Sequence, residues 1–113
     1  MIESFELLGI NTSLVAGLRV VGIEVPTQVQ SQVIPLALLG KDIIGQSATG
    51  TGKTLAFLLP LFQRIDTGKR ETQVIIIAPT HELAIQTLRQ VEMLAKNSGL
   101  RSEEHTSELQ SQP

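Results

Sequence analysis

Residues 47–54 read SATGTGKT, and this segment constrains the fold more than any other part of the chain. Residues 42–46, which precede it, place two isoleucines between turn-forming residues and predict a short strand. The apolar residues that follow it recur at helical spacing and predict a helix over residues 53–64. A glycine-rich loop between a strand and a helix can turn its backbone N–H groups inward around an anion. The sequence therefore predicts an α/β fold organised around this loop.

The last residues of this loop suit the binding of a triphosphate. Gly50 and Gly52 allow the backbone to turn, and the following helix points its positive end at the same anion. Lys53 supplies a mobile charge for the β and γ phosphates, and the hydroxyl of Thr54 suits a Mg²⁺ ion that bridges them. The strict pattern G-x-x-x-x-G-K-[ST] fails at its first glycine, where Ser47 stands. The alternative interpretation is a glycine-rich turn followed by an ordinary surface lysine.

Other periodic segments extend this pattern along the chain. We expect further helices at residues 12–21, 27–39 and 81–96, and a second strand at residues 74–78. The second strand is an unbroken apolar run, which is typical of a strand covered on both faces of a parallel sheet. The order strand, helix, strand, helix predicts a βαβ unit, in which a parallel sheet is flanked by helices.

Local signals predict where these helices begin and which apolar residues recur along them. Thr12 or Ser13 can cap the first helix, and Thr27 can cap the second. In the second helix, Val29, Val33, Leu36 and Leu39 fall on one stripe. In the helix after the loop, the apolar residues at helical spacing are Leu55, Leu58, Leu59 and Phe62.

Composition narrows the class of protein. A chain of 113 residues holds one domain at most, and its net charge of −2 argues against a broad basic surface for nucleic acid. The chain has no cysteine, which suits a reducing compartment. Its longest apolar run, residues 33–39, is too short to span a bilayer. We therefore expect a soluble, cytoplasmic protein that makes no contact with membranes.

Three segments together resemble the DEAD-box ATP-dependent RNA helicases, in the order that the family shows. Residues 22–30, GIEVPTQVQ, are similar to its Q motif, which with the upstream Phe5 spans residues 5–30. Residues 47–54 are similar to its Walker A loop, where a small residue such as Ser47 is usual. Residues 79–84, PTHELA, are similar to its motif Ia. The resemblance implies a RecA-like P-loop domain over residues 1–100 whose cofactors are ATP and Mg²⁺.

The resemblance also implies roles for individual residues. The residues expected to bind the nucleotide are Phe5, Gln30, Ser47, Ala48, Thr49, Gly50, Thr51, Gly52, Lys53 and Thr54. Within that set, Lys53 and Thr54 serve catalysis, Thr54 holds the metal, and the amide of Gln30 recognises adenine. The residues expected to contact RNA are Pro79, Thr80, His81 and Glu82. His81 stands where most members have arginine, so we expect weaker contact with RNA.

The chain contains no D-E-A-D sequence, so it lacks the acidic residues that would hold Mg²⁺ and orient the attacking water. We expect the parent protein to couple ATP hydrolysis to RNA unwinding and this piece alone to be inactive, with an incomplete sheet. The alternatives are another P-loop ATPase or small-molecule kinase, a short ATP-binding protein without catalysis, and a DNA-directed helicase of the same superfamily.

Residues 101–113, RSEEHTSELQSQP, differ in composition from the rest of the chain. They include one large apolar residue, Leu109, and cannot contribute to a core. They resemble the in-frame translation of a common sequencing adapter, so we expect a tail that is not native. The alternative is a genuine polar tail.

Overall fold

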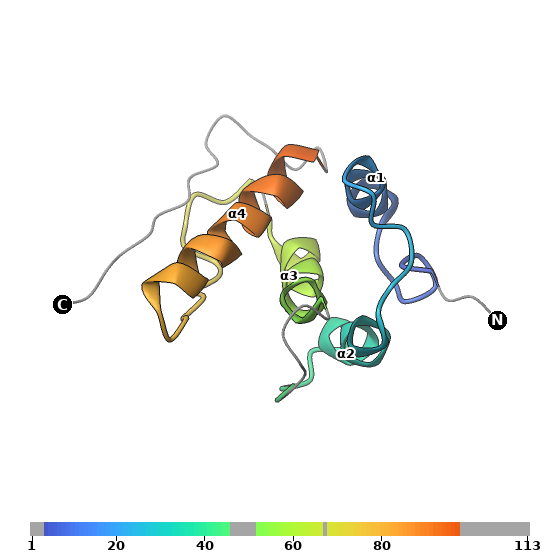
Figure 1. Ribbon diagram of the computed structural model, residues 1–113, viewed down its shortest axis with the longest axis horizontal. Coiled ribbons are helices and arrows are strands. Elements are labelled where there is room, and N and C mark those ends of the chain that lie inside the picture. The colour runs from blue at the N-terminus through green and yellow to red at the C-terminus, as the bar shows by residue number, and fades with distance from the viewer. Residues whose placement is uncertain (1–3, 46–51, 67, 98–113) are drawn as a thin grey trace.

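The computed structural model describes residues 4–45, 52–66 and 68–97, and the elements in this part of the chain are four helices. They are α1 (Thr12–Val20), α2 (Gln28–Leu38), α3 (Lys53–Arg64) and α4 (His81–Asn97). Figure 1 shows α3 at the centre, with α2 on one side and α4 on the other. In addition, α1 packs against α4, so the first and last of the described helices are in contact. All four helices lie where the sequence predicts them, within one or two residues.

The hydrophobic core is built around α3. Leu55, Leu58, Leu59 and Phe62, whose spacing predicted this helix, are each 6% exposed or less. These residues pack with apolar side chains from the N-terminal turn, α1, α2 and the end of α4, namely Phe5, Ile10, Leu14, Val15, Leu18, Ile34, Leu94 and Ala95. The helix that follows the phosphate loop is therefore held from several sides, which fixes the direction of its N-terminus.

The cap of α1 differs from the prediction by one residue. Asn11, and not Thr12 or Ser13, precedes the helix, and its Oδ1 accepts a hydrogen bond from the backbone N–H of Leu14 at 2.9 Å. All three residue types cap helices well, so local preference cannot choose among neighbours. The register that buries Leu14 and Leu18 in the core makes the choice.

The cap of α2 is confirmed, and its predicted apolar stripe is only partly buried. Thr27 precedes the helix and forms a capping box with Gln30. Within the stripe, Val33 is 6% exposed, whereas Leu36 is 47% and Leu39 73% exposed. The buried face consists of Gln30, Val33 and Ile34. Contact with α3 therefore selects a face that coincides only in part with the spacing of the apolar residues.

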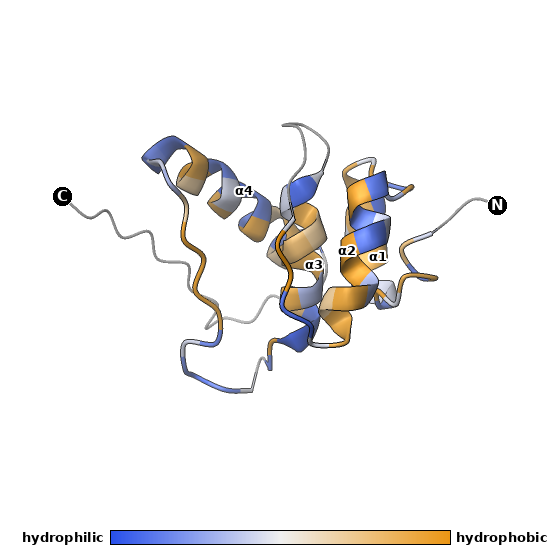
Figure 2. Cartoon of the chain, turned by 90° about the horizontal axis from the view of Figure 1, so that it is seen from below, coloured by the Kyte–Doolittle hydropathy of each residue, from blue (hydrophilic) through white to orange (hydrophobic). Residues whose placement is uncertain are grey.

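The two predicted strands are not formed in the part of the chain that the structure describes. Residues 42–45 and 74–78 have no assigned secondary structure, and Ile44, Ile75 and Ile77 are 96%, 79% and 90% exposed. Figure 2 shows the second of these segments as a continuous apolar stretch that leads into α4. A strand is defined by hydrogen bonds to a neighbour, and an isolated strand is unstable in water. The expectation of a covered strand is therefore wrong here, and the parallel sheet stays a prediction.

Among the described residues, no helix is both long and apolar enough to cross a membrane. The predicted non-native tail at residues 101–113 and the loop residues 47–51 lie outside the described residues.

Candidate nucleotide site

The described part of the phosphate loop consists of Gly52, Lys53 and Thr54, which begin α3. Gly52 is the N-cap, with φ +80° and ψ +18°, and as a glycine it has no side chain of its own with which to cap the first turn of the helix. The carbonyl of Gly52 accepts the hydrogen bond from the backbone N–H of Ala56 at 3.2 Å, so the helical ladder starts at once. The N–H groups that precede this bond have no partner within the helix. They form an end of partial positive charge that suits an anion.

The side chains at this helix start are accessible. Lys53 is exposed, and Thr54 is half-buried at the next position. An ammonium group on a flexible stem can follow a phosphate, and a hydroxyl beside it can bind a hard cation. Among the described residues, no cluster of acidic or histidine side chains forms a metal site of its own. Mg²⁺ in nucleotide sites is usually held by one or two protein groups together with phosphate oxygens.

Gln30 contacts the phosphate loop directly, which the sequence analysis did not predict. Its Nε2 donates a hydrogen bond to the carbonyl of Gly52 at 3.1 Å, and its Oε1 accepts one from the backbone N–H of Thr27 at 2.8 Å. The side chain is 2% exposed. A Cβ atom on Gly52 would lie 2.4 Å from this Nε2, so only glycine permits the contact. The structure thus brings together two residues that the sequence assigned to opposite ends of a nucleotide.

The two hydrogen bonds of the Gln30 side chain do not use all of the donor and acceptor capacity of its amide. A primary amide has a second N–H and a second lone pair, so a group with two bonds can still make two more. Adenine recognition by Gln30 stays a prediction. The spacing of Thr27 and Gln30 matches a capping box, and this signal could have indicated that the glutamine side chain turns back toward its own helix start.

Phe5 lies in the hydrophobic core. Its side chain is 1% exposed, and its backbone carbonyl accepts hydrogen bonds from the N–H groups of Leu8 and Ile10 at 3.2 and 3.0 Å. The aromatic ring therefore belongs to a compact turn that precedes α1. Its stacking on a base stays a prediction, and such stacking would use an edge or face that the core contacts now cover.

The sequence analysis did not identify Gln63, whose side chain bonds to the backbone that precedes α1. Its Nε2 donates to the carbonyl of Gly9, and its Oε1 accepts from the backbone N–H of Asn11, both at 2.8 Å. A glutamine in the last turn of a helix gives no signal of a partner more than fifty positions away. Only the packing of α3 against the N-terminal turn reveals it.

The predicted RNA-binding residues surround the start of α4. Pro79, Thr80, His81 and Glu82 are all exposed. Thr80 acts as a helix cap, because its Oγ1 accepts a hydrogen bond from the backbone N–H of Leu83 at 3.1 Å. Figures 1 and 2 both place this helix start on the opposite side of the molecule from α2. The segment is therefore separate from the contact between Gln30 and Gly52.

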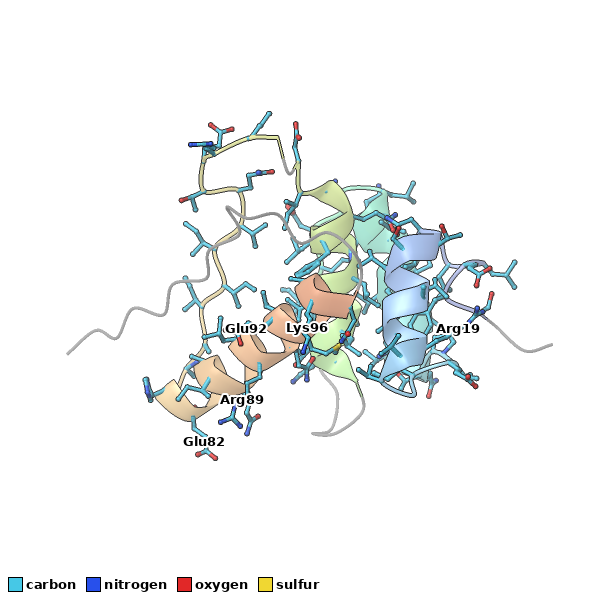
Figure 3. All side chains as sticks on the ribbon, turned by 90° about the horizontal axis from the view of Figure 1, so that it is seen from above. Arg19, Glu82, Arg89, Glu92 and Lys96 are labelled. Carbon is cyan, nitrogen blue, oxygen red and sulfur yellow. The ribbon has the colours of Figure 1, made fainter. Side chains whose placement is uncertain are left out.

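Charges on the described surface are mixed in sign. Figure 3 shows Glu82, Arg89, Glu92 and Lys96 projecting from α4, and Arg19 projecting from α1. Arg19 forms an exposed ion pair with Glu6, with 3.2 Å between Nη2 and Oε1. Acidic and basic groups alternate along α4, so this helix presents no uniform positive surface. A phosphate that binds here would depend on the N–H groups and hydroxyl at the start of the helix.

Comparison with known proteins identifies the group to which this chain is similar. The CshA protein of Bacillus cereus, a DEAD-box ATP-dependent RNA helicase, is 48% identical over 98 residues, which cover 87% of this chain and 19% of that protein. A DEAD box protein from Methanococcus jannaschii has 37% identity and a TM-score of 0.75 over 80% of this chain and 25% of its own. Dbp5 of S. cerevisiae, solved with RNA and ADP BeF3, has 37% identity and a TM-score of 0.78, over 82% of this chain and 24% of its own.

These likenesses confirm the predicted fold class, an incomplete RecA-like P-loop domain, while the sheet itself has no counterpart in the described residues. The chain spans about a fifth of the length of the curated relatives it matches. The sequence profile described as DEAD/DEAH box helicase matches residues 27–112, which is most of the chain. Together with the motif order and the geometry around Gly52, this match shows that the chain belongs to the DEAD/DEAH box helicase family.

Proposed function

We propose that the full-length protein carrying this chain is an ATP-dependent RNA helicase, which binds ATP and RNA and remodels RNA as it hydrolyses ATP. The observation that carries this proposal is the contact between Gln30 and Gly52, the glycine that begins α3. It joins the segment expected to recognise adenine to the loop expected to hold the phosphates. The CshA relative is named as a DEAD-box ATP-dependent RNA helicase, which supports the proposal.

The phosphate end of the site uses groups at the start of α3. We assign residues 47–54 to the phosphates of ATP, and Lys53 would place its ammonium beside the β and γ groups. Thr54 would hold a Mg²⁺ ion through its hydroxyl, and that ion, together with Lys53, would supply positive charge against the charge of the phosphates. Because Leu55 in the first turn of α3 belongs to the core, Lys53 and Thr54 need little rearrangement to bind.

The adenine end of the site uses α2 and the N-terminal turn. Gln30 offers one remaining N–H and one remaining lone pair, which together match the donor and acceptor on one edge of adenine. Guanine presents two acceptors on that edge, so the same amide discriminates against GTP. Phe5 contributes apolar contact with the base.

The RNA contact uses the start of α4. Thr80 and the first N–H groups of the helix bind a backbone phosphate, with Pro79, His81 and Glu82 around them. This mode needs no net basic charge, which agrees with the chain's net charge of −2. Imidazole at His81 lacks the permanent charge and the fork of arginine, so we propose that the contact is weaker than in members with arginine.

The sequence contains no D-E-A-D, so we assign the hydrolytic carboxylates to parts of the full-length protein outside this chain, and we propose that the chain alone does not hydrolyse ATP. We also propose that residues 1–100 are native and that residues 101–113 derive from an adapter. Amplifying and sequencing the locus across residue 100 tests this boundary, and a native codon run for residues 101–113 would contradict it.

The test of the function uses the full-length protein and the variant Lys53→Ala. We expect ATP binding, measured by titration calorimetry, to weaken at least tenfold, because the ammonium contacts the most highly charged part of the ligand. Lys69→Ala is the matched control, since Lys69 is an exposed lysine in the loop after α3, and it should bind ATP as the wild type does. Equal affinities of the Lys53→Ala variant and the wild type would refute the proposed phosphate site.

The same protein separates the alternatives. We expect RNA to stimulate ATP hydrolysis more strongly than DNA of the same sequence. Stronger stimulation by DNA would favour the DNA-directed helicase, and ATP binding without any stimulated hydrolysis would favour a non-catalytic binding protein.

A further inference from the structure

The side chain of Gln63 joins the last turn of α3 to the backbone that follows Phe5. Its amide donates to the carbonyl of Gly9 and accepts from the N–H of Asn11, both at 2.8 Å. The amide thus pairs with the backbone on either side of Ile10 as a neighbouring peptide group would. Two short bonds from one rigid amide fix both the position and the orientation of the segment that they grip.

The segment to which Gln63 bonds, residues 9–11, connects the turn that begins at Phe5 to α1. Ile10 lies in the core at 3% exposure, and its N–H donates to the carbonyl of Phe5 at 3.0 Å. On the other side, Oδ1 of Asn11 caps α1 through the N–H of Leu14. A change in the position of Gly9 or Asn11 is therefore transmitted to the backbone that carries the Phe5 ring.

Close packing on the opposite side limits how this segment can move. Gly9 has φ +106°, and a Cβ atom there would lie 2.8 Å from Cδ1 of Leu38 at the end of α2. The Gly9 backbone is thus enclosed between the end of α2 and the end of α3. Loss of the Gln63 contacts would leave Gly9 with the apolar contact to Leu38 and with the hydrogen bond of its N–H to the carbonyl of Glu6, at 3.0 Å, which lies within the same turn.

The placement of Gln63 on α3 relates the two ends of the nucleotide site. The same helix begins with Lys53 and Thr54, and ten residues of α-helix span about 15 Å. We propose that Gln63 is a positioning residue for adenine binding, which holds the Phe5 turn in register with the phosphate-binding start of α3. This inference rests on the proposed function, in which Phe5 contacts the base and Lys53 contacts the phosphates.

The contacts of Gln63 differ from those of a residue that serves stability alone. Both of its hydrogen bonds are exposed to solvent, where water readily replaces a lost partner. Gln73 provides a close comparison. Its amide also makes two exposed bonds to backbone, at 2.9 and 2.8 Å, but both go to Asp66 in the loop after α3. Both glutamines therefore bond to backbone through their amides, but Gln63 bonds to the N-terminal segment whereas Gln73 bonds to the loop after α3.

The experiment compares Gln63→Leu with Gln73→Leu in the full-length helicase. Leucine keeps most of the side-chain volume and removes both hydrogen-bonding groups. Titration calorimetry measures the affinity for ATP and for inorganic tripolyphosphate, which carries the phosphates without the base. We expect Gln63→Leu to weaken ATP binding about fivefold to tenfold and to leave tripolyphosphate binding unchanged, with a raised KM for ATP and a kcat within about twofold of wild type. We expect Gln73→Leu to change none of these quantities.

Several outcomes would overturn the inference. Unchanged ATP affinity in the Gln63→Leu variant would show that the contacts do not act on the base. Equal losses for ATP and tripolyphosphate, or equal losses in both glutamine variants, would indicate general loosening of the domain. The Lys53→Ala variant separates this failure from that of the proposed function. If Lys53→Ala lowers ATP affinity and Gln63→Leu does not, the phosphate site stands and the positioning role falls.

Discussion

Replacement of Gly52 by alanine tests the geometry at the centre of the site. The new Cβ atom would lie 2.4 Å from Nε2 and 3.2 Å from Cδ of Gln30, and 3.3 Å from Cγ2 of Thr27. It would also occupy a backbone conformation with φ +80°. The substitution therefore introduces two separate costs, namely backbone strain and displacement of the Gln30 amide.

The magnitude follows from adding these two effects. A residue other than glycine in the left-handed region costs about 1–2 kcal/mol. The amide of Gln30 must move away from the added carbon, which breaks its 3.1 Å bond to Gly52, and a net hydrogen bond contributes about 0.5–1.5 kcal/mol. We therefore expect Gly52→Ala to lower the free energy of unfolding by about 1.5–3.5 kcal/mol.

A second glycine separates strain from steric conflict. Gly22 has φ +83°, and a Cβ atom there would meet no other atom within 4 Å. Gly22→Ala should therefore carry the strain alone, about 1–2 kcal/mol. In a Gln30→Ala background, where the amide is absent and only the 3.3 Å contact with Cγ2 of Thr27 remains, the cost of Gly52→Ala should fall toward that of Gly22→Ala. Urea titration followed by circular dichroism provides all of these free energies.

Two results would refute this reasoning. Equal costs for Gly52→Ala and Gly22→Ala in the wild-type background would mean that the Gln30 amide does not constrain Gly52. Strict additivity of Gln30→Ala and Gly52→Ala would lead to the same conclusion, because residues in contact are expected to show coupling.

The remaining predictions concern the cap of α1, the selectivity for adenine and the contact with RNA. Asn11→Ala should lower the free energy of unfolding by about 0.5–2 kcal/mol through loss of the helix cap. Thr12→Ala should change it by less than about 0.5 kcal/mol. Reversed effects of the two substitutions in urea titrations would place the cap at Thr12. Gln30→Ala in the full-length protein should reduce the ratio of ATP to GTP affinity, because the amide is the group that distinguishes the two bases, and an unchanged ratio in competition binding would exclude that role. His81→Arg should lower the RNA concentration that gives half-maximal stimulation of ATP hydrolysis, and an unaltered stimulation curve would show that this position does not contact RNA.

The sequence predicted the helices because each is encoded by local spacing. The helix Lys53–Arg64 has the predicted bounds, and the four apolar residues whose spacing indicated it are all buried. Thr27 caps α2 as its position before the helix indicates. The family could also be predicted, because three motifs occur in order and each depends on residue types at short spacing. A local pattern of this kind requires no knowledge of what the element packs against.

The contacts of the site could not be predicted, because they join residues that are distant in sequence. Gln30 and Gly52 are 22 positions apart, and Gln63 and Asn11 are 52 positions apart. A glutamine side chain suits solvent, a helix cap or a buried contact equally well, so its residue type does not specify its partner. The packing of α2 and the N-terminal turn against α3 brings these partners together.

The amino-acid sequence by itself determined where the helices lie, which loop suits phosphate, and to which family the chain belongs. The tertiary structure alone decided that α2 buries Gln30, Val33 and Ile34, that Gln30 closes on Gly52, and that residues 74–78 remain unpaired. Helices form from bonds between residues four positions apart, whereas strands, buried faces and site contacts depend on groups from elsewhere in the fold. A sequence specifies the first kind of structure locally and the second only through packing.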